Sequence, residues 1–418
     1  MTKKLSEVDK VSSMLPSQNF LIEAGGSERR ISLEDVEKQL AKTFLFPSTE
    51  YTLEKNSNPA FDVSQRWAVD QYLAKVGGYM LKTVGGKTYA AKLNSEDWNY
   101  FADGTKVDDA SKYETMVHFP KCYFKGEGKT MHFGGLNPIS GGHSFDSPEW
   151  IGAYKMYVDE NGVGHSRPGV SPSHSKTMSQ FWACAQKLSS DYGLTGYPFQ
   201  CLINALYQAD YGNLDVQTTI GSGFQNSKWE ACRDVPMGKC INLGDGSGKV
   251  LYTDETIGNQ YSVKLYGVED LWAKLWEFRP NIRFYSSEGK RHAVIYAGNR
   301  VSNTATGRDI VITVLNASGS YISSMLLGEY WDMIPTAISG QATTYYCDGY
   351  WDNATGELLS VGGRADYGSL CGLGCANSIP GFSDSWTSIG ARLNFYTKIK
   401  HSYQRNILNT VPWSQQIT

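Results

Sequence analysis

Two stretches of the chain carry apolar residues at helical spacing. In QFWACAQKL, Phe181, Ala185 and Leu188 occupy positions i, i+4 and i+7, which places them on one face of a helix. The longer stretch YPFQCLINALYQADYG repeats this spacing over residues 197–212 and ends at a glycine that can stop a helix. The pattern therefore predicts two main helices, each with one buried face.

Most of the chain from about Gly77 onward alternates between short apolar segments and turn clusters. KTYAAKL and MVHFPKCYF show the period of two that is typical of strands. Clusters such as DENG at 159–162 separate the segments and indicate turns. Beyond residue 210 helical patterns nearly vanish, apart from a short candidate in VEDLWAKLWEF. We therefore expect a mixed α+β chain with short strands and long loops.

The first forty-odd residues form a separate pattern. NFLIEAGGSERRI has two short apolar runs around Gly25 and Gly26, which predicts a hairpin. Ser32 and Asp35 then form a capping pattern ahead of Val36, which predicts a short helix. So small a unit buries too little surface to be stable alone, so we expect it to pack on a partner, on another copy or on the next domain.

The amino-acid composition argues against binding to nucleic acid and against insertion into a membrane. The chain has 39 Lys+Arg against 42 Asp+Glu, whereas Tyr, Phe and Trp number 26, 16 and 11. A net charge of −3 provides no basic field for a phosphate backbone, so nucleic-acid binding is not expected. No run approaches the roughly 18 apolar residues of a membrane span, and no secretory signal is visible at the start, so we expect synthesis in the cytoplasm without a signal peptide and no membrane insertion.

Motifs for catalysis or metal binding are incomplete. GDGSGK at 244–249 resembles a phosphate loop, but Val250 stands where the magnesium-binding Ser or Thr belongs. Cys371 and Cys375 have no second ligand pair, and the next histidine is His401, so zinc spacing is missing. No G-x-S-x-G motif occurs. We therefore expect no catalytic residues, no metal site and no cofactor.

Two further segments differ from regular elements. In YGVEDLWAKLWEFRPNI, Trp272 and Trp276 accompany Glu269, which predicts a core segment where indole N–H groups need polar partners.

The segment 360–393 is irregular. About twenty-five Gly, Ser, Asp, Asn, Tyr, Cys and Leu residues lie there between a double glycine and IGARL, without a period of 2 or 3.6. We interpret this segment as loops held by strands at both ends, which is how a binding surface is displayed on a rigid scaffold.

Four stretches resemble a known family. They are IGAYK with the loop SRPGVSP, LYQADYGNLDVQTTIGSG, GVEDLWAKLWEF, and VGGR…GS…IGARL. In this order they resemble the C-type lectin-fold variable proteins of diversity-generating retroelements, in the formylglycine-generating (sulfatase-modifying) branch found in phage tail proteins. The resemblance covers roughly residues 70–395. It implies an α+β, C-type lectin-like fold with long loops, two main helices and mixed short strands.

The resemblance also implies a domain organisation. The N-terminal segment resembles the strand-and-helix unit that opens many phage fibre proteins. We expect an attachment or oligomerisation unit at 1–45, a linker at 46–70, a C-type lectin-fold domain at 71–395 and a C-terminal extension at 396–418.

In that family the segment between the double glycine and IGxRL varies and binds ligand. The resemblance implies a variable loop at 364–388 whose ligand-binding residues are Arg364, Ala365, Asp366, Tyr367, Leu370, Cys371, Gly374, Cys375, Phe382, Asp384 and Trp386. The scaffold residues would be Gly362, Gly363, Ile389, Gly390, Arg392 and Leu393. Cys371 and Cys375 would be chance occupants of variable positions, with a local disulfide as the open alternative.

The implied function is that of a non-enzymatic phage tail adhesin in the virion. It would recognise a bacterial cell-surface protein or glycan, contact other tail components and form an oligomer, most simply a homotrimer, because multivalency raises weak affinities. The alternative is a formylglycine-generating copper oxidase or another enzyme of the sulfatase-modifying fold. Those enzymes use a cysteine pair, but here Cys371 and Cys375 lie later in the segment and GLGCANS has no arginine.

Overall fold

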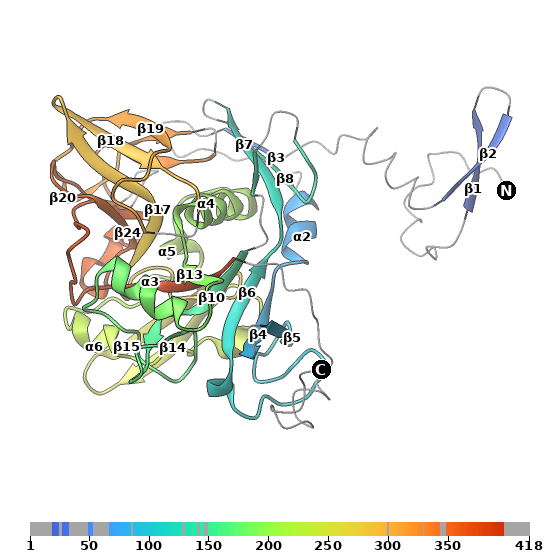
Figure 1. Cartoon of the computed structure of the whole chain (residues 1–418), viewed down its shortest axis with the longest axis horizontal. Helices are drawn as coiled ribbons and strands as arrows, with labels where there is room; N and C mark the ends of the chain where they lie inside the picture. Colours follow the sequence, from blue (N-terminus) through green and yellow to red (C-terminus); the bar gives the residue numbers. More distant parts are fainter. Residues whose placement is uncertain are drawn as a thin grey trace. The chain divides into compact units, whose positions relative to one another are not determined.

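The computed structural model divides the chain into two units, Met1–Ser48 and Thr49–Thr418, each considered by itself (Figure 1). It describes residues 19–24, 27–32, 49–52, 67–84, 87–127, 130–139, 143–145, 149–298, 301–328, 330–342 and 348–396. In the first unit, β1 (Asn19–Ala24) pairs antiparallel with β2 (Ser27–Ser32). The predicted hairpin is therefore confirmed, whereas the helix predicted after it lies outside the described residues.

Two large sheets form the frame of the second unit. One has six strands in the order β13-β27-β10-β6-β4-β5, and the other has eight, in the order β19-β18-β17-β24-β25-β23-β20 with β26 also paired to β17. The strands of the six-stranded sheet are β4 (Gly77–Val84), β5 (Lys87–Lys92), β6 (Glu114–Phe119), β10 (Glu149–Lys155), β13 (Tyr192–Leu194) and β27 (Arg392–Phe395). Those of the eight-stranded sheet are β17 (Trp276–Ser287), β18 (Lys290–Ile295), β19 (Arg308–Ile312), β20 (Ser318–Tyr321), β23 (Gly349–Trp351), β24 (Leu358–Gly362), β25 (Gly372–Asn377) and β26 (Ile389–Gly390).

Smaller sheets complete the unit. They are β3 (Thr49–Thr52) with β7 (Cys122–Glu127), β8 (Thr130–Gly135) and β9 (His143–Phe145); β11 (Tyr157–Val158) with β12 (Gly164–His165); β14 (Gly248–Asp254) with β15 (Gly258–Leu265) and β16 (Val268–Glu269); and β21 (Ser324–Leu327) with β22 (Met333–Ala337). Strand β3 falls inside the segment predicted as a linker and pairs antiparallel with β8. The C-terminal extension expected at 396–418 lies almost wholly outside the described residues.

The two helices predicted from apolar spacing are present as α3 (Met178–Gln186) and α4 (Tyr197–Tyr211). A capping box between Thr177 and Gln180 starts α3. Helix α4 ends at Gly212, whose φ of 66° is left-handed, because glycine adopts this conformation without strain. The shorter helices are α2 (Trp67–Leu73), α5 (Val216–Thr219) and α6 (Trp229–Arg233).

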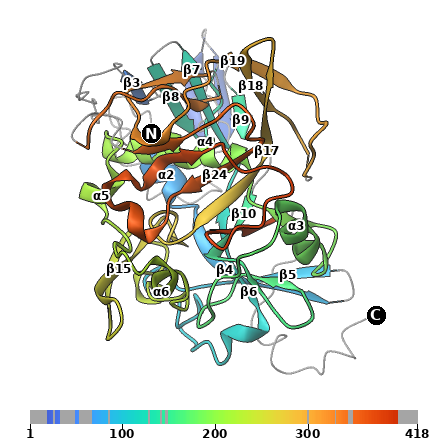
Figure 2. The same ribbon diagram turned by 90° about the vertical axis from the view of Figure 1, so that its left-hand side faces the viewer.

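Helix α4 lies inside the molecule rather than on it. It contacts β17 and β25 on one side and β8 and α2 on the other, and Figures 1 and 2 both show it between strands, with α3 and α6 at the outside. Because 13 of its 15 residues are buried, the prediction that it buries one face is wrong. None of the helices in the described ranges is long and apolar enough to cross a membrane.

The expected α+β class with two main helices is also wrong, because the described part of the chain is mostly β and its helices are short. The described ranges contain 27 strands, β1 to β27, against the short helices α2 to α6, and the sheets are curled, antiparallel or mixed. Several central strands are buried on both faces, as β24 is along its whole length. Such strands lack the alternation by which strands are recognised in sequence. The candidate helix in VEDLWAKLWEF instead forms β16 and the start of β17.

The predicted core segment is confirmed. Trp272 and Trp276 are 0% and 2% exposed, and the Trp272 indole N–H donates to the Gly221 carbonyl at 3.0 Å. The buried Glu269 carboxylate accepts backbone N–H bonds of 2.7 Å from Gly238 and 2.9 Å from Cys240. These bonds satisfy polar groups that burial would otherwise leave unpaired.

Candidate functional site

The double glycine turns the chain out of β24 towards the surface. Gly362 and Gly363 have φ values of +91° and +81°, which glycine alone adopts readily. A Cβ on Gly362 would lie 2.4 Å from the Leu271 carbonyl oxygen, and one on Gly363 would lie 2.5 Å from the Cys371 sulfur. Both positions therefore require glycine for conformation and for space. Residue 364, the first predicted ligand-binding position, follows directly.

A strand runs through the middle of the segment predicted as loop. Strand β25 pairs antiparallel with β24, where Val361 faces Ala376, and parallel with β23, where Tyr350 also faces Ala376. The prediction that residues 364–388 contain no regular element is therefore wrong. The sequence shows no period of 2 here because five of the six residues of β25 are buried, which removes the contrast between faces.

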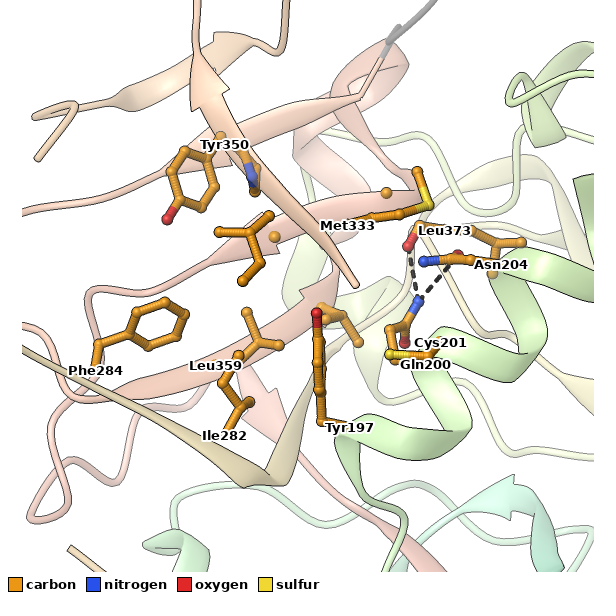
Figure 3. A pocket seen from close by; sticks show the side chains of 15 residues that line it. Tyr197, Gln200, Cys201, Asn204, Ile282, Phe284, Met333, Tyr350, Leu359 and Leu373 are labelled. Carbon is orange, nitrogen blue, oxygen red and sulfur yellow. Dashed lines mark hydrogen bonds between the residues drawn. The ribbon is translucent and has the colours of Figure 1, made fainter. Parts of the chain in front are cut away.

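Residues of β25 border a small, partly open cavity (Figure 3). Leu373 and Gly374 border a cavity of about 30 Å³ together with Tyr197, Gln200 and Asn204 of α4. The Gln200 side-chain amide donates to the Leu373 carbonyl at 2.8 Å. A cavity of this size has room for only one or two water molecules. It is therefore a packing feature and not a ligand site.

Three of the predicted ligand-binding residues are inside the protein. Ala365 is 1% exposed, and Cys371 and Cys375 are 0% exposed. Both thiols are free, and the Cys371 thiol donates to the Arg364 carbonyl at 3.2 Å. Burial raises the pKa of each thiol above its ordinary value, because an apolar environment disfavours the thiolate. A ligand at the surface would not reach these side chains. The prediction that these three residues bind ligand at the surface is therefore wrong.

The other predicted positions reach solvent to different degrees. Asp366 and Trp386 are exposed, and the half-buried positions are Arg364, Tyr367, Leu370, Gly374, Phe382 and Asp384. The residues predicted as scaffold, Gly362, Gly363, Ile389, Gly390, Arg392 and Leu393, are all buried. The surface that ligand can reach is thus formed by the residues just after the double glycine and by the loop between β25 and β26.

Arg364 is clamped between two aromatic rings. Its guanidinium carbon lies 4.5 Å from the centroid of the Trp229 ring and 4.6 Å from that of Tyr367. Its Nε and Nη2 atoms donate to the two carboxylate oxygens of Asp366 at 2.7 and 3.0 Å. Such stacking and bidentate bonding hold a guanidinium in one orientation. We call Trp229, Arg364, Asp366 and Tyr367 the Arg364 face.

The Arg364 face is anchored to the core through a stack of rings. Tyr367 packs on Trp351 with ring centroids 4.6 Å apart and meets the buried Trp276 edge-on at 5.9 Å. Burial raises the pKa of the Tyr367 phenol. Trp276 and Trp351 also meet edge-on at 5.3 Å. The aromatic side of the face is therefore held rigid by the interior.

The loop around Trp386 is fixed through its backbone. The Ser175 N–H donates to the Trp386 carbonyl at 3.2 Å, and Arg233 Nη1 donates to the Thr387 carbonyl at 3.2 Å. Earlier in the same loop, the Phe382 N–H donates to the Glu357 carboxylate at 3.0 Å. The Trp386 side chain remains 36% exposed, so it offers a large apolar surface on a fixed backbone.

Sequence reasoning missed Trp229 and Arg233, which belong to α6. Arg233 also contacts this ring, with its guanidinium carbon 5.3 Å from the Trp229 centroid. The only local signal is a Trp and an Arg four residues apart in SKWEACRD, which places both on one helical face. Nothing local connects that pair to Arg364. The described ranges contain no group of three or more His, Cys, Asp or Glu that could hold a metal ion.

No protein-family model and no curated protein sequence matches the chain. Among solved structures, the chain is similar to the Major Tropism Determinant P3c Variant, at 14% identity over 77% of this chain and 72% of that chain, with a TM-score of 0.30. It is similar to the Major Tropism Determinant U1 Variant at the same identity and coverage, with a TM-score of 0.29. A likeness of this extent determines neither the fold nor the function of this chain.

Proposed function

We propose that the chain is a non-enzymatic binding protein that recognises a receptor on a bacterial cell surface through the Arg364 face and the neighbouring Trp386. The observation that carries the proposal is the clamped guanidinium of Arg364, held by two rings and by Asp366. Its side chain keeps 23% of its surface exposed, so its remaining donors can meet a partner.

Rigid aromatic and arginine side chains are the groups that dominate binding energy at protein interfaces. A side chain already fixed before binding loses less conformational entropy when a partner arrives. Trp229, Tyr367 and Trp386 add contact area on backbones that are bonded into the fold. This arrangement favours recognition of a surface over chemistry at a single reacting atom.

The competing enzyme class needs a reactive cysteine pair. The thiolate is the form that attacks substrates and binds metals, whereas Cys371 and Cys375 are fully buried thiols with raised pKa values. Neither thiol is exposed to solvent, so a substrate could not contact them in this structure. This burial supports the binding function over a copper oxidase.

The motif resemblance supports the biological setting. On this basis the protein would be part of the tail or fibre of a phage virion, attached through its N-terminal unit and present as an oligomer, most simply a homotrimer. Several copies on one particle would raise a weak affinity through effective concentration. The receptor would be a bacterial surface protein or glycan, as host attachment requires.

Binding to whole cells tests the proposal. The fluorescently labelled full chain is mixed with a panel of bacterial strains, and bound label is measured by flow cytometry. We expect saturable binding to a subset of strains and a loss of about tenfold or more in Arg364→Ala, as for a central interface arginine. Lys249→Ala is the matched control, because Lys249 also lies over an aromatic ring, at 5.0 Å from Tyr261, but on β14. Binding to no strain, or equal binding by both variants, would contradict the proposal.

A further inference from the structure

A second concave surface lies beside Trp386. It is an open groove of about 480 Å³ between the β11–β12 hairpin and the loop that leads into α3. Its lining includes Tyr157, Asp159, Ser173, His174, Lys176 and Asp234. This volume falls within the range of roughly 300–1,000 Å³ that small-ligand sites occupy. None of these residues belongs to the segment 364–388.

Two hydrogen bonds connect the walls of this groove to the Trp386 loop. Ser175, between the lining residues His174 and Lys176, donates its N–H to the Trp386 carbonyl at 3.2 Å. On the other wall, Arg233 donates to the Thr387 carbonyl at 3.2 Å and is paired with the lining residue Asp234. The backbone of the Trp386 loop is therefore bonded to residues beside the groove.

Two of the three acidic residues that line the groove, Asp159 and Asp234, already have partners. Asp234 makes a bidentate pair with Arg233, at 2.7 and 2.8 Å, and the bonds to Arg233 lower the pKa of its carboxyl. The Asp159 carboxylate accepts the backbone N–H of Val163 at 2.8 Å and lies 3.3 Å from His165 Nε2. Neither carboxylate needs a cationic ligand, and both would repel an anionic one.

The remaining groups suit uncharged hydroxyls. Burial lowers the pKa of His174 below its ordinary value, so its ring is neutral near pH 7, with Nδ1 2.7 Å from the Ser175 hydroxyl. Lys176 and Glu160 have opposite charges and both line the groove. Tyr157 provides a flat wall, since its ring is stacked on His165 with an interplanar angle of 27°.

We propose that this groove binds a neutral carbohydrate, with hexose hydroxyls bonded to its polar groups and the sugar's C–H face on Tyr157. A polar groove in which two carboxylates are already paired, with one fixed aromatic wall and an exposed tryptophan on the bonded loop, fits a polyhydroxylated ligand better than an anionic one. The inference rests on the proposed function, since the carbohydrate would be part of the surface glycan recognised by the Arg364 face and Trp386.

Binding of the full chain to an array of immobilised neutral, acidic and amino-sugar glycans tests this inference. We expect binding to neutral glycans, a loss of about tenfold or more in His174→Ala, as for a hydrogen-bonding group in a specific site, and no loss in His292→Ala. His292 is a matched control because it is also half-buried and its Nδ1 also has a side-chain partner, which is Asp309 rather than a serine, but it lies on β18. Hydroxyl-radical footprinting of the wild type adds a readout that needs no variant, with protection expected at Tyr157 and His174 when the glycan is bound.

Absence of neutral-glycan binding would overturn the inference, and so would glycan binding that leaves His174→Ala unaffected and Tyr157 unprotected. The cell-binding experiment separates this failure from failure of the proposed function. Arg364-dependent cell binding without neutral-glycan binding would remove the groove site alone. Glycan binding in the groove without Arg364-dependent cell binding would remove the receptor-binding role of the Arg364 face alone.

Discussion

Arg392 and Glu277 form an ion pair that is completely buried, with 2.7 Å between Arg392 Nη2 and Glu277 Oε1. Arg392 belongs to β27 of the six-stranded sheet and Glu277 to β17 of the eight-stranded sheet. The same guanidinium donates to the carbonyls of Gly152 and Ala153 at 2.9 Å and of Glu269 at 2.8 Å. One arginine thus joins both sheets and uses all its donors without contact with water.

Replacing Glu277 with glutamine should destabilise the fold strongly. Its carboxylate also bonds Lys155 at 2.5 Å and Arg279 at 2.8 Å. Burial alone would raise the pKa of Glu277, but Arg392, Lys155 and Arg279 together hold it well below the ordinary value. Glu277→Gln leaves these buried cations uncompensated, at a cost of about 3–5 kcal/mol.

Urea unfolding at pH 7 measures this loss of stability. Asp108→Asn is the control, because it removes a carboxylate from the exposed ion pair with Lys112 at 3.5 Å, where pairing contributes little. We expect the control to leave the unfolding midpoint unchanged. A Glu277→Gln midpoint equal to that of the wild type would show that the buried network is dispensable.

Alanine at Gly363 should cost more than alanine at Gly104. Both residues have positive φ, +81° and +83°, but a Cβ on Gly104 has nothing within 4 Å, whereas one on Gly363 would meet the Cys371 sulfur at 2.5 Å. Positive φ costs each alanine about 1–2 kcal/mol, and overpacking adds about 1–3 kcal/mol at Gly363 alone. The difference between the two free energies of unfolding isolates the packing cost. If both substitutions lower the free energy of unfolding equally, the interior near Cys371 accommodates the added Cβ without cost.

Lysine at position 364 should weaken cell binding while leaving the fold intact. Lysine keeps the charge but loses the planar stacking between Trp229 and Tyr367 and the bidentate bond to Asp366. We expect the apparent affinity for bound strains to fall about tenfold, or about 1.4 kcal/mol, with the thermal midpoint nearly unchanged. Lys249→Arg is the reciprocal control on β14. If Arg364→Lys binds as tightly as the wild type, charge alone suffices and the clamped geometry is irrelevant.

His118 should make stability depend on pH between about 6.5 and 4. Its ring lies 4.4 Å from Trp150, and burial lowers its pKa from 6.5 to about 4. In this window the unfolded chain binds a proton that the folded chain does not, so the free energy of unfolding decreases as pH falls. The change in pKa corresponds to about 3 kcal/mol.

Comparison with His118→Gln isolates this contribution, because carboxylates titrate in both proteins. The urea midpoints of the wild type, measured at pH 7, 6, 5 and 4, should approach those of His118→Gln as pH falls, because the stability that the neutral histidine contributes is lost. Parallel profiles for the two proteins would assign the pH dependence to other groups.

Alkylation should distinguish the half-buried Cys184 from the fully buried Cys371 and Cys375. The thiolate is the reacting form, and burial raises the pKa of all three thiols, but only the two interior ones are also closed to solvent. With iodoacetamide at pH 8 we expect Cys184 to react about tenfold faster or more in the native chain, and all three to react alike in urea. Peptide mapping by mass spectrometry reads each site. If Cys371 is labelled as rapidly as Cys184 in the native chain, its thiol is accessible at the surface and the burial described above is wrong.

Short-range sequence patterns were enough to predict part of this structure. Apolar spacing located α3 and α4, and Gly212 marked the end of α4, because a helix and its stop depend on residues within a few positions of each other. The combination of Trp272 and Trp276 with an acidic residue likewise identified a buried segment. The double glycine marked the start of the irregular segment in the sequence, and its positive φ values give that motif a physical basis.

Tertiary packing decided the rest. Strand β25 is recognisable only beside β23 and β24, since burial on both faces erases its period, and this is also why the α+β expectation underestimated the strands. Cys371 and Cys375 became interior residues by the same packing. The Arg364 face joins α6 to the segment after β24, so its clamp depends on contacts between distant parts of the chain. Local sequence determined where elements begin and end, whereas burial and long-range contact decided which side chains are left to meet a partner.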